Sequence, residues 1–243
     1  WEPRQQQVDM SAAVAEALGT KGQLLVEAGT GVGKSFGYLV PAIRRILEYG
    51  ETVVVATNTI TLQEQIIHQD VPVLEEAFGE GFHPVLVKGR GNYVSLRRLE
   101  RAVQQRTSLL HDSNAQEELM RLEQWAQGTD DGSKASLSML PRGDVWELIK
   151  SDGSRCLGKK CPRHSVCFYQ QARREMEQGN LLVCNHALFF SDLALRNRGA
   201  GFLPRYDHVI FDEAHALEDV AADHFGASIS ENQVEYFLRS LLP

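Results

Sequence analysis

The sequence lacks the features that mark membrane, secreted and strongly basic proteins. No apolar run approaches about 20 residues, the length of a membrane-spanning helix, and the first residues show no signal-peptide pattern. The net charge of −7 argues against a uniformly basic coat for nucleic acid. We therefore expect a cytoplasmic protein without a membrane partner.

Cysteine is scarce, with four residues in the chain. Without a secretory signal this number suggests a reducing compartment, where clustered cysteines bind metal more often than they form disulfides. The chain begins at Trp1 rather than Met and stops at Pro243 after a helical stretch, so we expect a fragment of a longer protein. Its 243 residues allow one sizeable domain or two small ones.

Positive charge is concentrated in the middle of the chain. Residues 91–179 hold 14 Lys and Arg against 12 Asp and Glu, a net charge of +2, and the remainder has a net charge of −9. Two basic clusters, 97–106 and 155–174, flank an acidic centre. Such clusters can follow a phosphate backbone, but solvated helix faces explain them equally well.

A glycine-rich segment, EAGTGVGKS at 27–35, separates the apolar run 24–26 from residues 36–47, which have helical apolar spacing. A strand, a glycine-rich loop and a helix start, in this order, predict a phosphate-binding loop. Glycine amides approach phosphate oxygens closely, and the helix N-terminus adds positive potential. The loop residues expected to contact nucleotide are Ala28, in place of the commoner first Gly, and Gly29, Thr30, Gly31, Val32, Gly33, Lys34 and Ser35.

Each polar residue of this site has an expected task. Lys34 can reach the β- and γ-phosphates, and Ser35 can offer its hydroxyl to Mg²⁺. The later segment Asp212-Glu213-Ala214-His215 follows an apolar run and supplies the second half of the site. We expect Asp212 to hold Mg²⁺, Glu213 to deprotonate the attacking water, and His215 to sense the γ-phosphate.

A helix predicted from Trp1 to Leu18 precedes the loop, with Val8, Met10, Val14 and Leu18 on its apolar side. Arg4 and Gln7 join the candidate nucleotide-binding residues, because the Gln7 amide can both donate to and accept from an adenine edge. A polar surface position is the alternative for Gln7.

Short apolar runs alternate with helical segments and predict an α/β fold with a parallel sheet and helices on both faces. The five candidate strands are 24–26, 52–56, 84–87, 180–184 and 208–211. Residues 94–179 contain no run of this kind, only helical stretches at 96–103 and 117–125, a polar segment and three cysteines. We expect a mainly helical insertion in the α/β domain.

The motif order resembles that of the DinG/XPD-like superfamily 2 DNA helicases, nearest to the bacterial DinG side, over almost the whole chain. The motifs that carry the resemblance are Gln7, AGTGVGKS, Thr57-x-Thr-x-x-Leu-Gln-Glu-Gln, KGRGNY, the cysteines, Asn185-His186 and DEAH. It implies a RecA-like motor domain at 1–90 and 180–219, an iron–sulfur insertion at 91–179 and the start of a helical, arch-like domain at 220–243.

The resemblance also implies partners and contacts. It implies a monomeric, nucleoid-associated motor that uses ATP to move 5′→3′ on single-stranded DNA. The residues expected to contact DNA are Thr57, Thr59, Arg90, Tyr93 and Asn185. Helix capping by the threonines and a core position for Tyr93 are the alternatives.

A 4Fe–4S cluster is the third expectation from the resemblance. Cys156, Cys161 and Cys167 match three family ligands, but Ser95 stands where the family has the fourth cysteine. A serine oxygen binds iron less well than a thiolate, so the cluster is absent, labile or held by three cysteines. The spacing also permits a Cys₃His zinc site with His164. We expect Cys184, at a strand end, to be a buried structural thiol.

We expect this chain to be the ATP-binding and ATP-hydrolysing motor domain of a DNA helicase, unable to unwind DNA without a second motor domain. One alternative is an ATP-regulated, nuclease-associated helicase-like protein. Another is a passive module that binds single-stranded DNA.

Overall fold

The computed structural model describes residues 4–29 and 31–225. They form two compact units, one from residues 1–80 with 183–243 and the other from residues 81–182, as far as these ranges are described. No helix in the described ranges combines the length and apolar character needed to cross a membrane. The expected boundaries between motor domain and insertion remain a prediction.

The first unit is built around buried parallel strands. β1 (Val53–Thr57) pairs in parallel with β4 (His208–Phe211), with Val54 opposite Val209. The four-stranded sheet has the order β2 (Pro84–Leu86), β3 (Leu181–Asn185), β1, β4, and the residues of β2 and the first two residues of β3 fall within the range of the second unit. Every residue of β1 is buried, as its continuous β-branched run predicts for a strand covered on both faces. The predicted α/β class is confirmed.

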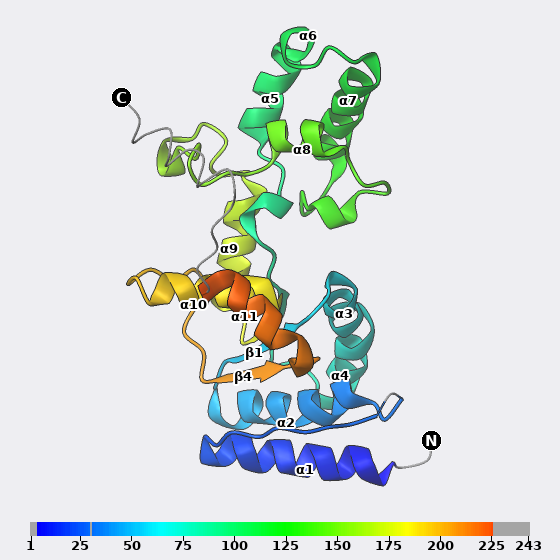
Figure 1. Cartoon of the computed structure of the whole chain (residues 1–243), viewed down its shortest axis with the longest axis vertical. Helices are drawn as coiled ribbons and strands as arrows, with labels where there is room; N and C mark the ends of the chain where they lie inside the picture. The colour runs from blue at the N-terminus through cyan, green and yellow to red at the C-terminus, as the bar shows by residue number, and fades with distance from the viewer. Residues whose placement is uncertain (1–3, 30, 226–243) are drawn as a thin grey trace, which may run out of the picture. The chain divides into compact units, whose positions relative to one another are not determined.

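Helices surround these strands (Figure 1). α1 (Gln5–Thr20) packs against α2 (Lys34–Tyr49), and α10 (His186–Arg196) packs against α11 (Leu217–Phe225). After β1 the chain forms α3 (Ile60–Gln65), a π-helical turn η1 (Ile66–Asp70) and α4 (Val71–Phe78). In α1, Val14 and Leu18 are buried as predicted, whereas Val8 is 53% exposed.

The predicted strand at 24–26 is wrong. These residues have no strand geometry, and Leu24, Leu25 and Val26 are 45%, 88% and 38% exposed. Because α1 packs directly on α2, the segment that joins them runs along the helix pair, where it pairs with no strand in the described ranges (Figure 1). An apolar run of three residues is too short to specify a strand.

The second unit is mainly helical, as expected for residues 91–179. Its helices are α5 (Leu96–Gln104), α6 (Arg106–Leu109), α7 (Ser113–Gly128), α8 (Gly143–Ile149) and α9 (Phe168–Gln178). Its core joins α5, α7 and α8 through Leu99, Leu119, Trp146 and Ile149. The indole of Trp146 donates to the Gly91 carbonyl over 2.9 Å, which ties α8 to the chain before α5.

The predicted helical tail is described only in part. α11 begins at Leu217 and is described to Phe225. The remainder of the expected arch-like segment, residues 226–243, lies outside the described residues.

Candidate nucleotide site

The glycine-rich loop leads directly into α2, as the sequence predicts. Gly31 and Gly33 have φ angles of +77° and +82°, which favour glycine because a Cβ is strained there. The Gln7 amide donates to the Gly33 carbonyl over 2.9 Å, and Arg4 donates to the Gly31 carbonyl. Arg4, which precedes α1, and Gln7, on α1, therefore both brace the loop; adenine recognition by Gln7 stays a prediction. Thr30 lies outside the described residues.

The loop lysine meets the predicted base. Lys34 Nζ lies 2.9 Å from Glu213 Oε1, although 179 positions separate the two residues in the chain. The hydrogen bond from Lys34 lowers the pKa of Glu213, and the same contact raises the pKa of Lys34. Glu213 has a φ angle of +55°, a strained conformation for a residue with a Cβ. Strain of this kind is common at functional sites.

Asp212 is oriented by two hydrogen bonds. The Tyr38 hydroxyl donates to Asp212 Oδ2 over 3.1 Å, and the Glu213 amide donates to Oδ1 over 3.0 Å. Tyr38 is 2% exposed, and burial raises its pKa well above the ordinary value, so it acts as a fixed donor. His215 is less constrained: its side chain is 76% exposed, and Nδ1 lies 3.4 Å from Glu213 Oε2.

Asp70, which the sequence analysis missed, belongs to this site. It ends the π-helical turn η1, is 7% exposed, and its Oδ2 atom has no hydrogen-bond partner in the described structure. Burial is the main cause that raises the pKa of Asp70, and the nearby Asp212 charge also raises it. A hydrogen bond with the Ser35 side chain acts in the opposite direction and lowers it. The structure thus gathers Ser35, Asp70 and Asp212 at the start of α2. π-helical turns often occur at functional sites, but no sequence pattern marked this one.

His186 joins the ends of two strands. Its Nε2 atom donates to the carbonyls of Ala56, at 3.1 Å, and Asp212, at 2.8 Å. The ring is 1% exposed, and desolvation lowers its pKa, which favours the neutral form. The sequence analysis placed His186 in a motif without giving it a task; the structure shows that it fixes the backbone of Asp212.

Three predicted DNA contacts make local hydrogen bonds at strand ends. The buried Thr57 hydroxyl donates to the Thr59 carbonyl over 3.1 Å. The Thr59 hydroxyl oxygen accepts from the Leu62 amide and caps α3, and Asn185 Oδ1 accepts from the Leu188 amide and caps α10. The capping alternative therefore holds for Thr59 but not for Thr57, and DNA contact by all three residues remains a prediction.

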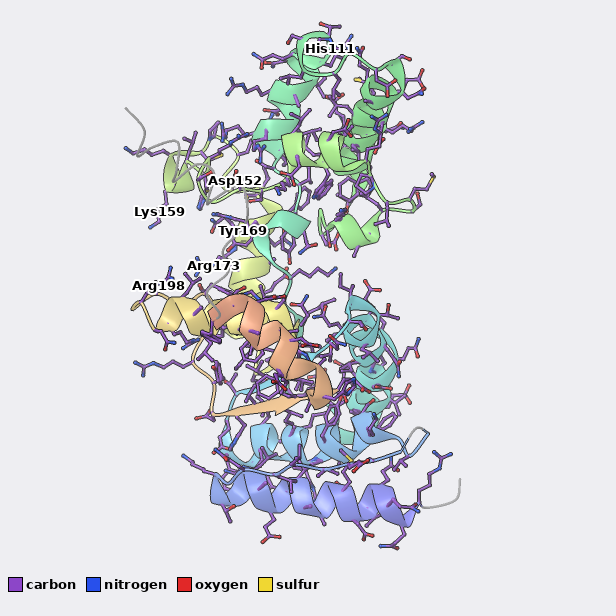
Figure 2. All side chains as sticks on the ribbon, viewed as in Figure 1. His111, Asp152, Lys159, Tyr169, Arg173 and Arg198 are labelled. Carbon is purple, nitrogen blue, oxygen red and sulfur yellow. The ribbon has the colours of Figure 1, made fainter. Side chains whose placement is uncertain are left out.

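The other two predicted DNA contacts lie in the second unit. Tyr93 is 5% exposed, and its ring centre lies 5.9 Å from that of Tyr169, so in this structure the ring belongs to the core. The Arg90 guanidinium lies 4.2 Å from the Tyr169 ring centre and donates to Cys156 Sγ over 3.4 Å. Figure 2 labels Tyr169, near the start of α9.

The cysteines do not form a metal site in this structure. Cys156 is exposed, and Cys161 and Cys167 are half-buried. Within residues 4–29 and 31–225, no three His, Cys, Asp or Glu side chains lie close enough together to hold a metal ion. The residues therefore fit neither the iron–sulfur nor the zinc arrangement as placed. Cys184 is fully buried, and burial raises its pKa to about 12, in agreement with a structural thiol.

Comparison with known proteins finds helicases. A family model described as DEAD/DEAH box helicase matches residues 8–106, and a second, described as DEAD_2, matches residues 153–234. The chain is 35% identical, over 96% of its length, to "ATP-dependent DNA helicase YoaA" of Haemophilus influenzae, and covers 36% of that protein. It is 37% identical, over 89% of its length, to "ATP-dependent helicase DinG" of Mycobacterium tuberculosis, and covers 34% of it. The chain thus spans about a third of the length of these curated relatives.

Proposed function

The chain belongs to the DinG-like helicases of the DEAD/DEAH box type, and from this premise we propose that it is an ATP-hydrolysing motor domain that acts on single-stranded DNA. The observation that carries the proposal is the 2.9 Å contact between Lys34 and Glu213, which joins the phosphate-binding loop to the DEAH segment. The proposed cofactors are ATP and Mg²⁺, and the proposed motor is a cytoplasmic, nucleoid-associated monomer that moves 5′→3′.

The proposed reaction is phosphoryl transfer to water. Lys34 would neutralise charge on the β- and γ-phosphates, and Ser35 and Asp212 would hold Mg²⁺, which supplies positive charge at the phosphates. Glu213 accepts the proton of the attacking water. A γ-phosphate that binds the Lys34 ammonium group would release Glu213 from its ion pair with Lys34. Nucleotide binding would thus set free the base that hydrolysis requires.

The chain covers about a third of the length of its relatives. We therefore propose that this third alone binds nucleotide weakly, hydrolyses it slowly and does not unwind DNA. Stimulation of ATP hydrolysis by single-stranded DNA in the longer protein would exclude a passive binding module. Assays on forked and single-stranded DNA would separate a helicase from an ATP-regulated, nuclease-associated protein.

The 4Fe–4S cluster remains a prediction from the resemblance. Three cysteines and Ser95 are the residues expected to hold it, but the described structure does not bring them together as a ligand set. Iron and zinc analysis of protein purified without oxygen separates a cluster from a zinc site. The proposed ATP chemistry does not depend on either metal.

Substitution of the proposed base tests the function. Glu213→Gln in the longer protein should lower DNA-stimulated ATP hydrolysis at least about 100-fold, because general-base catalysis contributes about 10²–10⁴-fold. Nucleotide binding should persist, since the phosphate ligands remain. The control is Glu218→Gln, which removes an exposed carboxylate from α11 and should leave the rate unchanged. Equal rates for Glu213→Gln and the control would refute the assignment of the base.

A further inference from the structure

A cleft of about 500 Å³ in the second unit is lined by arginines. It lies along α5 and is bordered by the end of α8 and by the loop that precedes the cysteines. Its volume falls in the range of about 300–1,000 Å³ typical of ligand sites. The four basic lining residues are Arg97, Arg98, Arg101 and Arg155.

Arg98 forms the fixed floor of this arginine cleft. It is 8% exposed, and its guanidinium donates to the carbonyls of Glu147, at 2.6 Å, and Lys150, near the C-terminal end of α8. These partners are backbone carbonyls, so they satisfy donors without supplying a full negative charge. Desolvation, followed by the charge of Arg155, lowers the pKa of Arg98, and the charges of Asp152 and Glu147 offset this only in part. The fold therefore holds like charges close together, which lowers the stability of the folded state.

Negative charge offsets only part of this cluster. No acidic residue is among the described residues that line the cleft. Asp152, labelled in Figure 2, lies 3.7 Å from Arg155 Nε, and the Glu147 carboxylate is paired with Lys150. The wall between the arginines includes Leu109 and Leu148. The cleft therefore presents excess positive charge beside an apolar surface.

We propose that the arginine cleft binds the phosphodiester backbone of a single nucleic-acid strand. Arg97 and Arg101 supply charge-assisted hydrogen bonds to phosphate, and the apolar wall contacts a sugar or base without reading its identity. Arg97 also donates to the Arg155 carbonyl over 2.6 Å, so it can hold the loop against α5 while it faces the ligand. The inference rests on the proposed DNA motor and adds to it a specific gripping site.

Binding of a fluorescent oligothymidine to the 243-residue chain, without nucleotide, tests the cleft. Arg97→Gln/Arg101→Gln should weaken binding at least about 10-fold and should reduce the slope of log affinity against log salt by about 1–2, since two phosphate contacts are lost. The matched control is Arg106→Gln/Arg121→Gln, which removes two exposed arginines that do not line the cleft. The control should lose less than about 3-fold in affinity, because charges outside the cleft attract the strand only at long range, where salt screens the attraction.

A second variant separates the loss of phosphate contacts from misfolding, because Arg97 also donates a hydrogen bond to the loop at Arg155. Arg101→Gln keeps that contact and should by itself weaken binding about 3-fold or more, whereas Arg101→Lys should restore part of the loss. Equal losses in the cleft and control variants, or no binding by the unsubstituted chain, would overturn the proposal. Displacement of the oligonucleotide by excess ATP or inorganic phosphate would instead show a site for a free anion. The binding measurement does not depend on ATP hydrolysis, so its failure leaves the Glu213 test of the motor function independent.

Discussion

Lys34 and Glu213 satisfy each other in the structure, with side chains 30% and 29% exposed. A partly solvated ion pair of this kind contributes little to stability, so it can open when a phosphate competes for the lysine. The strained backbone of Glu213 and the fixed Asp212 carboxylate lie beside it. A phosphate that binds Lys34 would therefore free the Glu213 carboxylate while Asp212 keeps its orientation.

Asp70 is expected to lower the stability of the fold. Its buried Oδ2 atom has no partner in the described ranges, and a buried carboxylate oxygen without a hydrogen bond is costly. Asp70→Asn removes the charge that burial and Asp212 disfavour, so it should raise the free energy of unfolding by about 1 kcal/mol, or Tm by about 2–4 °C, in thermal unfolding at neutral pH. The control Asp223→Asn, at an exposed position in α11, should change Tm by less than about 1 °C. A fall in Tm for Asp70→Asn would show that the carboxylate stabilises the site.

The sequence predicted which residues meet at the phosphate-binding loop better than it predicted the residues that support them. Lys34, Asp212 and Glu213 were identifiable because their spacing follows the chemistry of phosphate and Mg²⁺. Asp70 and the support given by His186 depend on which strands and helices become neighbours, and no local pattern records this. Tyr93 was ambiguous for a related reason, because an aromatic residue suits a core and a stacking surface equally well.

At the scale of elements, Glu51 connects three segments of the first unit. The Arg45 guanidinium, from α2, donates two hydrogen bonds of 2.7 Å to its carboxylate, and His208, at the start of β4, lies 2.9 Å away. The hydrogen bond from Arg45 is the main cause that lowers the pKa of Glu51 to about 2. The ionised carboxylate therefore holds α2, β1 and β4 together at neutral pH.

This contact predicts a specific acid sensitivity. Because the pKa of Glu51 is lower in the fold than its ordinary value of 4.5, its stabilisation is complete above about pH 4.5 and is lost as the pH falls toward 2. Glu51→Gln should lower the free energy of unfolding by about 2 kcal/mol at pH 7. In chemical denaturation, the difference from the unsubstituted chain should shrink between pH 4.5 and 2. The control Glu16→Gln on α1 should show no such difference, and a constant difference for Glu51→Gln would refute the explanation.

Elements were predictable in proportion to their length and burial. The β-branched run of β1 and the long helices α1 and α2 were predicted to within a few residues, whereas α7 extends beyond the predicted 117–125 at both ends. The segment 24–26 was predicted as a strand but runs along the α1–α2 pair. A run of three apolar residues fits either environment, and packing between distant helices decides the outcome.

At the scale of the whole molecule, the charge pattern and the fold agree. Residues 91–179, which carry the net positive charge, lie entirely within the second unit, where α5 presents three of the four arginines of the cleft. The first unit holds the proposed ATP site within its own residues. The sequence predicted a basic surface and a solvated helix face with equal weight, and only the fold could show that the arginines share a cleft.

Calorimetric titration of MgATP into the 243-residue chain tests the central claim, that the loop and the DEAH segment form one nucleotide site. We predict binding that Lys34→Ala weakens at least about 10-fold, because the charge-assisted contacts to phosphate are lost. Arg44→Ala, an exposed change on the same helix, should leave the affinity unchanged. Equal affinity of the Lys34→Ala variant and the unsubstituted chain would contradict the account.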